Sequence, residues 1–461
     1  MSQSFFRRLP TVQELLDSPP LRRLVQTAHR TSVATGVQHF LDAMRDELRT
    51  ATADIPAPAD LAERIASWIA AQKAAPPGPA INAAGVLFST ELQGPLLAEE
   101  AQQALHRAAR DRSLGADESA NRDRYVENQL AQLAGAEAAA VFHAGPGALL
   151  TTLATLAPSL DVVVARGQVA DIQGLALPEL IAAARARLRE VGVANRVTVD
   201  DYAPFLAEQA GVLLQLAPRN YAVVGDKVEP SLEELAGLSR THRVPLVAHL
   251  GAGGVVDLPQ SASPWPSASS ALQAGVDLCV LDGDGLLGGP ACGVVVGRRE
   301  WVDRICEHPL RTALRADRLA IAALAATLDL YLAQPVAWSS LPLAALLAAP
   351  VENLQNRAER MAPQWAALPG VEASAATACR TTLGAATGAA HDLPSWGVEL
   401  RVHGNTGVEL AARLRRQTPA VVARVLERGV LLDLRGVLPR QDVELIGAVE
   451  AAVRAAAKAA D

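Results

Sequence analysis

The chain has 461 residues, of which half are apolar and a fifth are charged, and its net charge is −7. This length predicts two or three domains, and no run approaches the roughly 20 apolar residues of a membrane span. The first ten residues lack the apolar run of a secretory signal, and the four cysteines are too few and too scattered for a disulfide framework or a zinc site, so we expect a cytoplasmic protein without a bound metal.

The N-terminal segment is more basic than the rest of the chain. Residues 1–50 hold seven arginines against five acidic residues, a balance of +2, so the remainder carries −9 (−7 minus +2). A basic module on an acidic body could meet RNA phosphate, although a solvated helical face gives the same composition. Charge alone leaves both interpretations open.

The first 75 residues read as a small helical module. Thr11 and Glu14 have the spacing of a capping box, and apolar residues from Val33 to Leu48 recur at helical spacing. Another amphipathic pattern runs from Leu61 to Ile69. We therefore assign residues 1–75 to this module.

Residues 81–335 have the texture of an α/β domain with a mostly parallel sheet. Short apolar runs alternate here with longer helical patterns, one of which opens with a capping box at Ser231 and Glu234. The expected strands are Ala139–Phe142, Val162–Val164, Gly211–Leu214, Pro245–Ala248, Leu278–Leu281 and Gly293–Val296. Residues 341–461 predict a smaller α/β domain that ends in a helix from Gln441 to Ala457.

Several segments resemble one family in the same order along the chain. They are Leu9-Pro10-Thr11-Val12, Ile81-Asn82-Ala83-Ala84-Gly85-Val86, Gly135-Ala136-Glu137, Arg166-Gly167-Gln168, Asn220-Tyr221, Leu250-Gly251-Ala252-Gly253, Leu286-Leu287-Gly288-Gly289-Pro290, His308-Pro309-Leu310 and Leu431-Leu432-Asp433-Leu434-Arg435. Together they resemble the bacterial selenocysteine synthases, the L-seryl-tRNA(Sec) selenium transferases. The resemblance covers all three expected domains, and no single motif carries it.

The resemblance implies a fold, an activity and partners. The fold is that of the fold-type I pyridoxal phosphate transferases. The family converts serine carried on a dedicated tRNA into selenocysteine with pyridoxal phosphate and selenophosphate. It binds tRNA(Sec) through its N-terminal helices, here residues 1–75, and forms homo-oligomers built from dimers.

The cofactor lysine of the family is missing from this chain. The family's Ser-Gly-Asp-Lys-Leu-Leu-Gly-Gly-Pro run corresponds to residues 282–290, which place Gly285 at the lysine position. The only lysines are Lys73, Lys227 and Lys458, and none lies near this run in the sequence. A Schiff base requires an amine, so we expect no covalently bound pyridoxal phosphate.

Other pocket positions differ from the family as well. His249 stands where an aspartate would hold the pyridine nitrogen protonated, and neutral imidazole cannot replace that charge. A run of asparagines at the phosphate turn corresponds to His143, Ala144 and Gly145. Together with Asp284 and Gly285, these residues predict a vestigial cofactor pocket whose backbone amides could still hold an anion.

The substrate-anion residues are only partly retained. Gly94 and Thr312 stand at two arginine positions of the family, whereas Arg315 and Arg166 match it. Arg311 lies beside Thr312 and could compensate for it. We therefore assign Arg315, Arg311 and Arg166 as the candidate substrate-anion residues, with no confident catalytic residue.

A dinucleotide fingerprint is only superficial here. Gly283, Gly285 and Gly288 spell G-x-G-x-x-G after an expected strand, but this motif must open a helix. The residues that follow, 291–296, predict another strand instead. We expect no NAD site.

The sequence favours a non-catalytic paralogue that keeps the fold and binds RNA, a protein partner, or an authentic family enzyme in a hetero-assembly. One alternative is an active selenium transferase, or related pyridoxal phosphate enzyme, that works without a Schiff-base lysine. Another is a pocket recruited for a different small anion, lined by His143 and His249.

Overall fold

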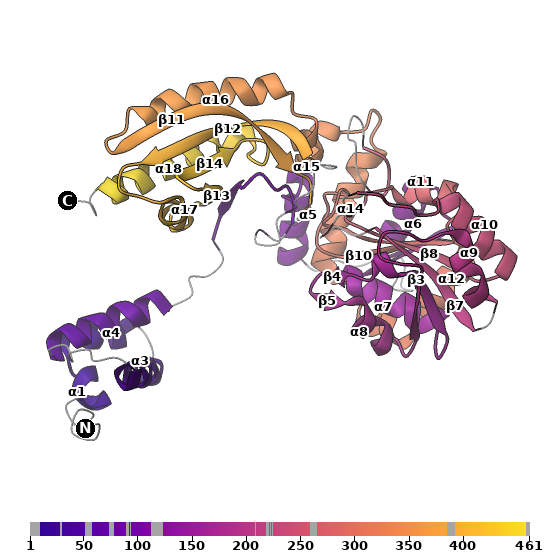
Figure 1. Ribbon diagram of the computed structural model, residues 1–461, viewed down its shortest axis with the longest axis horizontal. Coiled ribbons are helices and arrows are strands. Elements are labelled where there is room, and N and C mark those ends of the chain that lie inside the picture. Colours follow the sequence, from indigo (N-terminus) through magenta and orange to yellow (C-terminus); the bar gives the residue numbers. More distant parts are fainter. Residues whose placement is uncertain are drawn as a thin grey trace. The chain divides into compact units, whose positions relative to one another are not determined.

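The computed structural model describes residues 10–27, 30–50, 58–72, 78–88, 92, 94–111, 123–207, 209–217, 221, 223, 225–258, 265–384 and 392–457. Leu9, Lys73, Asn220 and Lys458, which the sequence analysis singled out, lie outside these residues. The chain divides into two compact units, Met1–Gly78 and Pro79–Asp461 (Figure 1).

The first unit consists of helices around a small apolar core. They are α1 (Val12–Leu16), α2 (Pro19–Thr27), α3 (Arg30–Thr50) and α4 (Pro58–Gln72). The expected capping box is confirmed, because the Glu14 amide donates to Thr11 Oγ1 at 3.2 Å and the Thr11 amide donates to Glu14 Oε2 at 2.7 Å. Buried residues such as Leu21, Val37 and Ile65 come from three of the helices and form one cluster.

The second unit contains a seven-stranded sheet that is parallel except for one strand. Its spatial order is β2 (Ala138–Phe142), β10 (Gly293–Gly297), β9 (Leu278–Asp282), β8 (Leu246–Gly251), β7 (Ala210–Leu216), β3 (Asp161–Ala165) and β6 (Arg187–Val191). Strand β10 runs antiparallel to both of its neighbours. The expected apolar strands are all confirmed, because fully buried strands read as continuous apolar runs.

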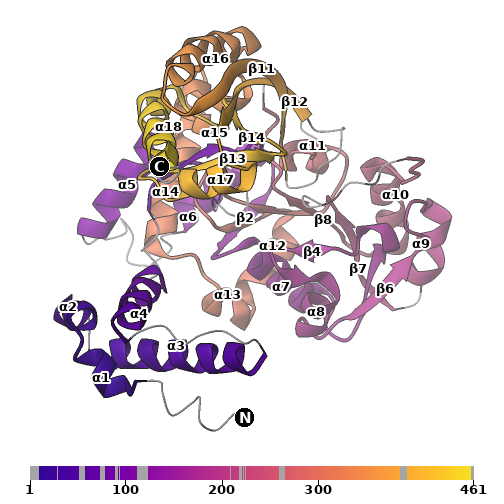
Figure 2. The ribbon, with the colours of Figure 1, turned by 60° about the vertical axis from the view of Figure 1, so that its left-hand side comes forward.

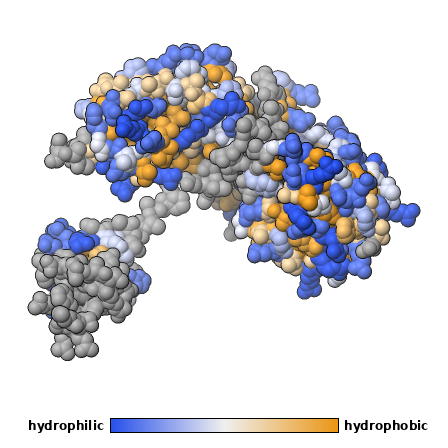
Figure 3. Space-filling view, in the orientation of Figure 1, coloured by the Kyte–Doolittle hydropathy of each residue, from blue (hydrophilic) through white to orange (hydrophobic). Residues whose placement is uncertain are grey.

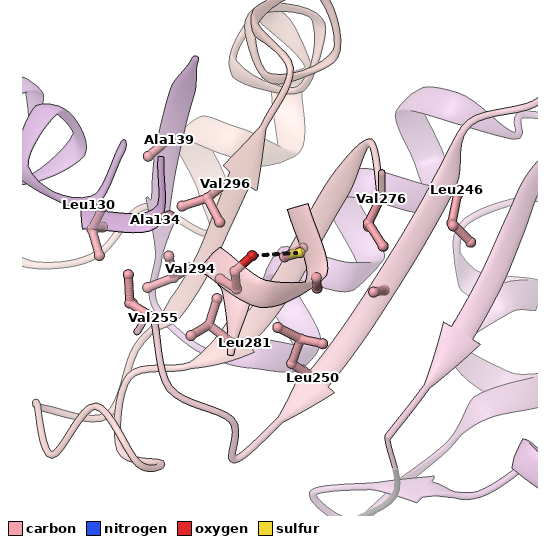
Figure 4. Close-up of a cluster of buried hydrophobic side chains, with 14 of the residues drawn as sticks. Leu130, Ala134, Ala139, Leu246, Leu250, Val255, Val276, Leu281, Val294 and Val296 are labelled. Carbon is pink, nitrogen blue, oxygen red and sulfur yellow. Dashed lines mark hydrogen bonds between the residues drawn. The ribbon is translucent and has the colours of Figure 1, made fainter. Parts of the chain in front are cut away.

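Helices cover both faces of this sheet (Figure 2). One apolar layer includes residues of α6 (Arg124–Ala134), α9 (Val199–Leu206), α10 (Leu232–His242), α11 (Ala268–Gln273) and α14 (Arg318–Leu332). The other includes residues of α7 (Gly145–Leu156), α8 (Leu177–Ala183) and α12 (Arg299–Glu307). Alternate strand residues face the two layers, so Val294 and Val296 point into the first cluster (Figure 4) and Val295 into the second.

A five-stranded sheet forms the smaller lobe of the same unit. Its order is β1 (Ala80–Ala83), β13 (Ala420–Leu426), β14 (Gly429–Asp433), β12 (Asp392–Val402) and β11 (Val371–Thr382). Residues of α16 (Val351–Ala366), α17 (Gly407–Arg415) and α18 (Asp442–Ala457) share one core with it. The sequence assigned Ile81–Ala83 to the larger domain, whereas Ala80–Ala83 pair in parallel with Ala420–Ala423 of this smaller sheet.

Shorter elements connect these parts. They are α5 (Glu99–Arg110), η3 (Arg166–Gln168), β4 (Asp171–Ile172), β5 (Leu175–Ala176), α13 (Pro309–Ala313), η4 (Trp338–Ser340), α15 (Pro342–Leu347) and η6 (Pro439–Gln441). Hydrophilic and hydrophobic residues are interspersed on the face of the second unit shown in Figure 3. Among the described helices, none is both long enough and apolar enough to cross a membrane.

Candidate functional site

Three parallel strands bring most of the predicted pocket residues to one edge of the larger sheet. Strand β2 ends at Phe142, β8 at Gly251 and β9 at Asp282. The carboxyl ends of parallel strands are where open α/β sheets bind ligands. The structure therefore places His143–Gly145, His249 and Asp284–Gly285 along this edge of the sheet.

The turn after β2 leads directly into helix α7. The His143 amide donates to the Leu314 carbonyl at 2.8 Å, while its side chain is exposed. Ala144 is the N-cap residue and makes no side-chain cap, and Gly145 is buried at the first helical position. At Ala144 and Gly145 this turn has only backbone polar groups, and its one polar side chain, that of His143, is exposed to solvent.

His249 is a buried residue of a central strand. It lies in β8 between Leu216 of β7 and Val280 of β9, and it is 4% exposed. Its neighbour Val247 packs in the layer under α7, and strand alternation puts His249 on that same face. Position 249 therefore lies on the face of the sheet that α7 covers, with an imidazole where the family has a carboxylate.

Gly285 sits in a tight turn that leaves no room for a side chain. A Cβ built on Gly285 would lie 2.5 Å from the carbonyl oxygen of Ala252 and 2.7 Å from its Cα. The next amide, Leu286 N–H, donates to that same carbonyl at 2.7 Å. The turn is therefore packed directly on the backbone that follows β8, and any residue larger than glycine would have to displace it.

The same turn carries two carboxylates. Asp282 is 1% exposed, and its Cγ would lie 3.1 Å from a Cβ built on Gly145 at the start of α7. Asp284 is half-buried, and its Oδ2 would lie 3.3 Å from a Cβ on Gly94, which has a φ of +97°. Asp284 thus lies beside Gly94, and sequence reasoning missed the position of Asp282 against Gly145.

Arg311 is held by two carboxylates of the segment that opens α6. Its Nη2 lies 3.1 Å from Asp123 Oδ2 and 3.0 Å from Glu127 Oε1, and its side chain is 10% exposed. Burial acts to lower the pKa of this guanidinium, but the charges of Glu127 and Asp123 outweigh it and raise the pKa. Arg311 is therefore a buried, paired cation.

Arg315 shares the Asp123 carboxylate. Its Nε lies 2.9 Å from Asp123 Oδ2, and its side chain is 37% exposed. The backbone of Arg315 forms an isolated antiparallel β-bridge with Phe142, so Arg315 lies beside the end of β2. Sequence reasoning missed Asp123 and Glu127, because their spacing of four marks only a helix start and says nothing of partners more than 180 positions away.

Arg166 lies elsewhere on the sheet. It begins η3 after β3, its side chain is 55% exposed, and its Nε lies 3.0 Å from Glu190 Oε2 at the end of β6. The predicted anion residues therefore do not form one cluster, because Arg311 and Arg315 share Asp123 whereas Arg166 pairs separately.

Lys227 is the one lysine within the described residues. Its Nζ lies 2.8 Å from Glu229 Oε2, and its side chain is 44% exposed. Val228, the next residue, bridges to Arg196 after β6. Lys227 thus lies in a surface segment and contributes no amine to the turn around Gly285.

The residues present do not fit covalently held pyridoxal phosphate. An amine is absent from position 285, and backbone atoms occupy the space that its side chain would need. An imidazole stands at position 249, and a carboxylate lies against the first residue of α7. Each of these features opposes one part of the cofactor: its aldehyde, its pyridinium or its phosphate.

The chain is similar to the selenium transferases along nearly its whole length. The family model for L-seryl-tRNA selenium transferase matches residues 80–438. The L-seryl-tRNA(Sec) selenium transferase of Moorella thermoacetica is 34% identical, with 99% of this chain and 98% of that protein covered. The corresponding protein of Geobacter sulfurreducens is 33% identical, with 97% and 99% covered.

Solved structures show the same fold. D-glucosaminate-6-phosphate ammonia-lyase aligns with a TM-score of 0.60 at 20% identity, covering 83% of this chain and 97% of that one. Together with the strand order, this likeness confirms the expected fold-type I pyridoxal phosphate transferase architecture.

Proposed function

The chain belongs to the L-seryl-tRNA selenium transferase family, and we propose that it is a non-catalytic member that retains the fold and binds RNA or a protein partner. The family uses pyridoxal phosphate. The observation that carries the proposal is Gly285, which stands at the lysine position and is packed on Ala252 so closely that no side chain fits. Without an amine there, the aldehyde of the cofactor has no covalent anchor.

Two further features favour loss of the pyridoxal phosphate chemistry over its transfer to other residues of the chain. The described lysine, Lys227, is engaged with Glu229 on the surface. Arg311 is buried against Asp123 and Glu127, so its charge is balanced within the protein. An enzyme that worked without the lysine would therefore also need another group to protonate the pyridine nitrogen. It would further need other cations to bind the substrate anion.

The test is covalent trapping of the cofactor on the purified full-length protein. Pyridoxal phosphate is added, sodium borohydride reduces any imine, and intact mass and peptide mapping follow. The expected result is no stoichiometric adduct, with an active selenium transferase run in parallel to show that trapping works. A one-to-one adduct on any single side chain would overturn the proposal and favour the active-enzyme alternative.

We further propose that the N-terminal helical unit carries the RNA contact. The relatives act on tRNA, and this unit has its own apolar core, with Arg22 and Arg23 exposed on α2. Two adjacent exposed cations could meet phosphate, and such binding weakens with salt. In a nitrocellulose filter-binding assay at low salt, the full-length protein is expected to bind tRNA(Sec).

Charge reversal separates this contact from general electrostatic attraction. Arg22→Glu with Arg23→Glu is expected to weaken retention at least about tenfold, since each lost phosphate contact removes counterion release. The matched control is Arg110→Glu, an exposed arginine of the second unit whose side chain is 84% exposed, which should change little. Equal loss in both variants would count against the N-terminal unit as the RNA site.

We also propose that this protein assembles as its family does. A homo-oligomer built from dimers is expected in light scattering of the purified protein. Co-expression with an authentic family enzyme would show whether mixed assemblies form. A monomer at micromolar concentration in both experiments would contradict this part of the proposal.

A further inference from the structure

The N-terminus of helix α7 is the natural place for an anion in this pocket. The helix has 12 residues and follows β2 directly, and its N-cap residue Ala144 supplies no side-chain cap. Pro146 has no amide proton, so the amides of Ala144, Gly145 and Gly147 are the donors at this end that the helix itself leaves unused. Free amides and the helix dipole together attract negative charge at such an end.

The carboxylate of Asp282 lies against this helix end. Its Oδ1 contacts the space where a Cβ of Gly145 would stand, and its Cγ lies 3.1 Å from that point. The residue is 1% exposed, so its charge is shielded from solvent. Only glycine at position 145 allows this approach, because any side chain would collide with the carboxylate.

Strand geometry places Asp282 on this side of the sheet. Leu278 and Val280, which alternate with it along β9, belong to the apolar layer under α7. The antiparallel strand β10 begins at Gly293, which pairs with both Phe142 and Asp282, so the ends of β2 and β9 lie at the same level. The contact with Gly145 is thus a consequence of the sheet register.

The surroundings of Asp282 add a second negative charge. Burial is the main reason that the pKa of the nearby Cys292 thiol is raised, and the charges of Asp284 and Asp282 add to it. An incoming phosphate would therefore meet the Asp282 carboxylate at this helix end, with the charge of Asp284 in the same turn. Like charges in a buried site repel more strongly than in water, because the effective dielectric constant there is low.

We infer that Asp282 is a built-in anion against the first residue of α7, so that its side chain excludes phosphate-bearing ligands from this end of the helix. The inference deepens the proposed function and rests on it. With glycine at position 285 the cofactor cannot form a Schiff base, and with Asp282 beside α7 its phosphate cannot bind at the start of that helix. It also disfavours recruitment of the pocket for another small anion.

Binding of inorganic phosphate and of pyridoxal phosphate to the full-length protein tests the inference. Isothermal titration of the wild type is expected to show no saturable binding of either compound. Asp282→Ser, which introduces the residue of the family's run, should bind phosphate at least about tenfold more tightly, because the repelling charge beside the helix end is gone. Phosphate should also raise the melting temperature of this variant and leave that of the wild type unchanged.

Two further variants separate charge from space and from folding. Asp282→Asn keeps the shape and removes the charge, so a gain in phosphate binding with this variant assigns the exclusion to charge. Asp284→Asn, a carboxylate outside the contact with Gly145, is the matched control and should gain less than Asp282→Asn. If Asp282→Ser does not fold, Asp282→Asn decides.

Saturable phosphate binding by the wild type would overturn the inference, as would a folded Asp282→Ser or Asp282→Asn variant that gains none. Neither outcome touches the proposed loss of catalysis, which fails only on a reducible cofactor adduct. The two proposals can therefore be rejected separately.

Discussion

Arg311 Nη2 lies 3.1 Å from Asp123 Oδ2, and the Arg311 guanidinium carbon lies 5.0 Å from the centre of the Phe142 ring. The cation is thus held between a buried carboxylate and an aromatic face at the end of β2. Arrangements of this kind are costly to break, because each charge left behind remains buried without its partner. Arg311 therefore ties α13 to the start of α6.

Replacing Arg311 should destabilise the second unit markedly. Arg311→Met is expected to lower the free energy of unfolding by about 3–5 kcal/mol, because Asp123 and Glu127 lose their buried counter-ion. Urea unfolding followed by tryptophan fluorescence measures the effect. The matched control is Arg166→Met, whose pair with Glu190 is largely exposed and should contribute about 0–1 kcal/mol.

A second variant tests whether the loss comes from uncompensated charge. Arg311→Met combined with Glu127→Gln should lose less stability than Arg311→Met alone, because one of the stranded carboxylates is then neutral. Equal losses would mean that Arg311 acts through packing on Phe142, and the electrostatic interpretation would be wrong.

Gly285 should not tolerate even a methyl group. Gly285→Ala brings a Cβ onto the Ala252 backbone, so we expect a loss of about 1–3 kcal/mol from overpacking. Gly237→Ala is the control: it lies inside α10 with nothing within 4 Å of its Cβ, and it should gain about 0.5–1 kcal/mol of stability. Equal effects of the two substitutions in urea unfolding would show that the turn is not tightly packed.

Restoring the lysine alone should not restore the cofactor bond. In Gly285→Lys the side chain must displace the Ala252 backbone, and Asp282 still lies at the end of α7. We expect no stoichiometric borohydride-reducible adduct with pyridoxal phosphate. The triple variant Gly285→Lys, Asp282→Ser, His249→Asp is tested in the same assay for comparison. A stoichiometric adduct in the single variant would show that the turn rearranges to accommodate the lysine.

The thiol of Cys306 should react slowly at neutral pH and faster as the pH rises. Burial raises its pKa, the charge of Glu127 raises it further, and Arg311 partly opposes this. A raised pKa means less thiolate at a given pH, so alkylation by iodoacetamide increases through and above the ordinary thiol range near pH 8.5. Mass spectrometry of peptides after timed labelling gives the rate at each pH.

Glu127→Gln should accelerate this labelling by roughly two- to tenfold at pH 8, because a charge that raises the pKa is removed. Cys279 and Cys292 are internal standards, since both are buried and should stay unlabelled in the folded protein. A slower Cys306 in this variant would contradict the electrostatic coupling between these residues.

Local features of the sequence predicted most of the elements. The capping boxes at Thr11 and Ser231 formed as expected, because each depends on residues three positions apart. The run 291–296 became strand β10, so the glycine pattern before it opens no helix. Gly285 could be recognised at the lysine position because the glycines and proline around it are retained.

Contacts between distant segments could not be predicted in this way. The sequence assigned residues 81–335 to one domain, yet β1 hydrogen-bonds to β13, some 340 positions away. Arg311 was expected to compensate for Thr312 in anion binding, but its partners Asp123 and Glu127 come from another helix. Periodicity along the chain reports which face of an element is apolar, and it carries no information on which polar group lies opposite.

The sequence by itself determined the family, the order of helices and strands, and the absence of an amine from the cofactor turn, because these depend on residue identity and short-range spacing. Only the tertiary structure decided that the turn leaves no space beside Ala252 and that Asp282 lies at the start of α7. Those facts follow from the register of β2, β9 and β10, which is set by hydrogen bonds between strands far apart in the chain.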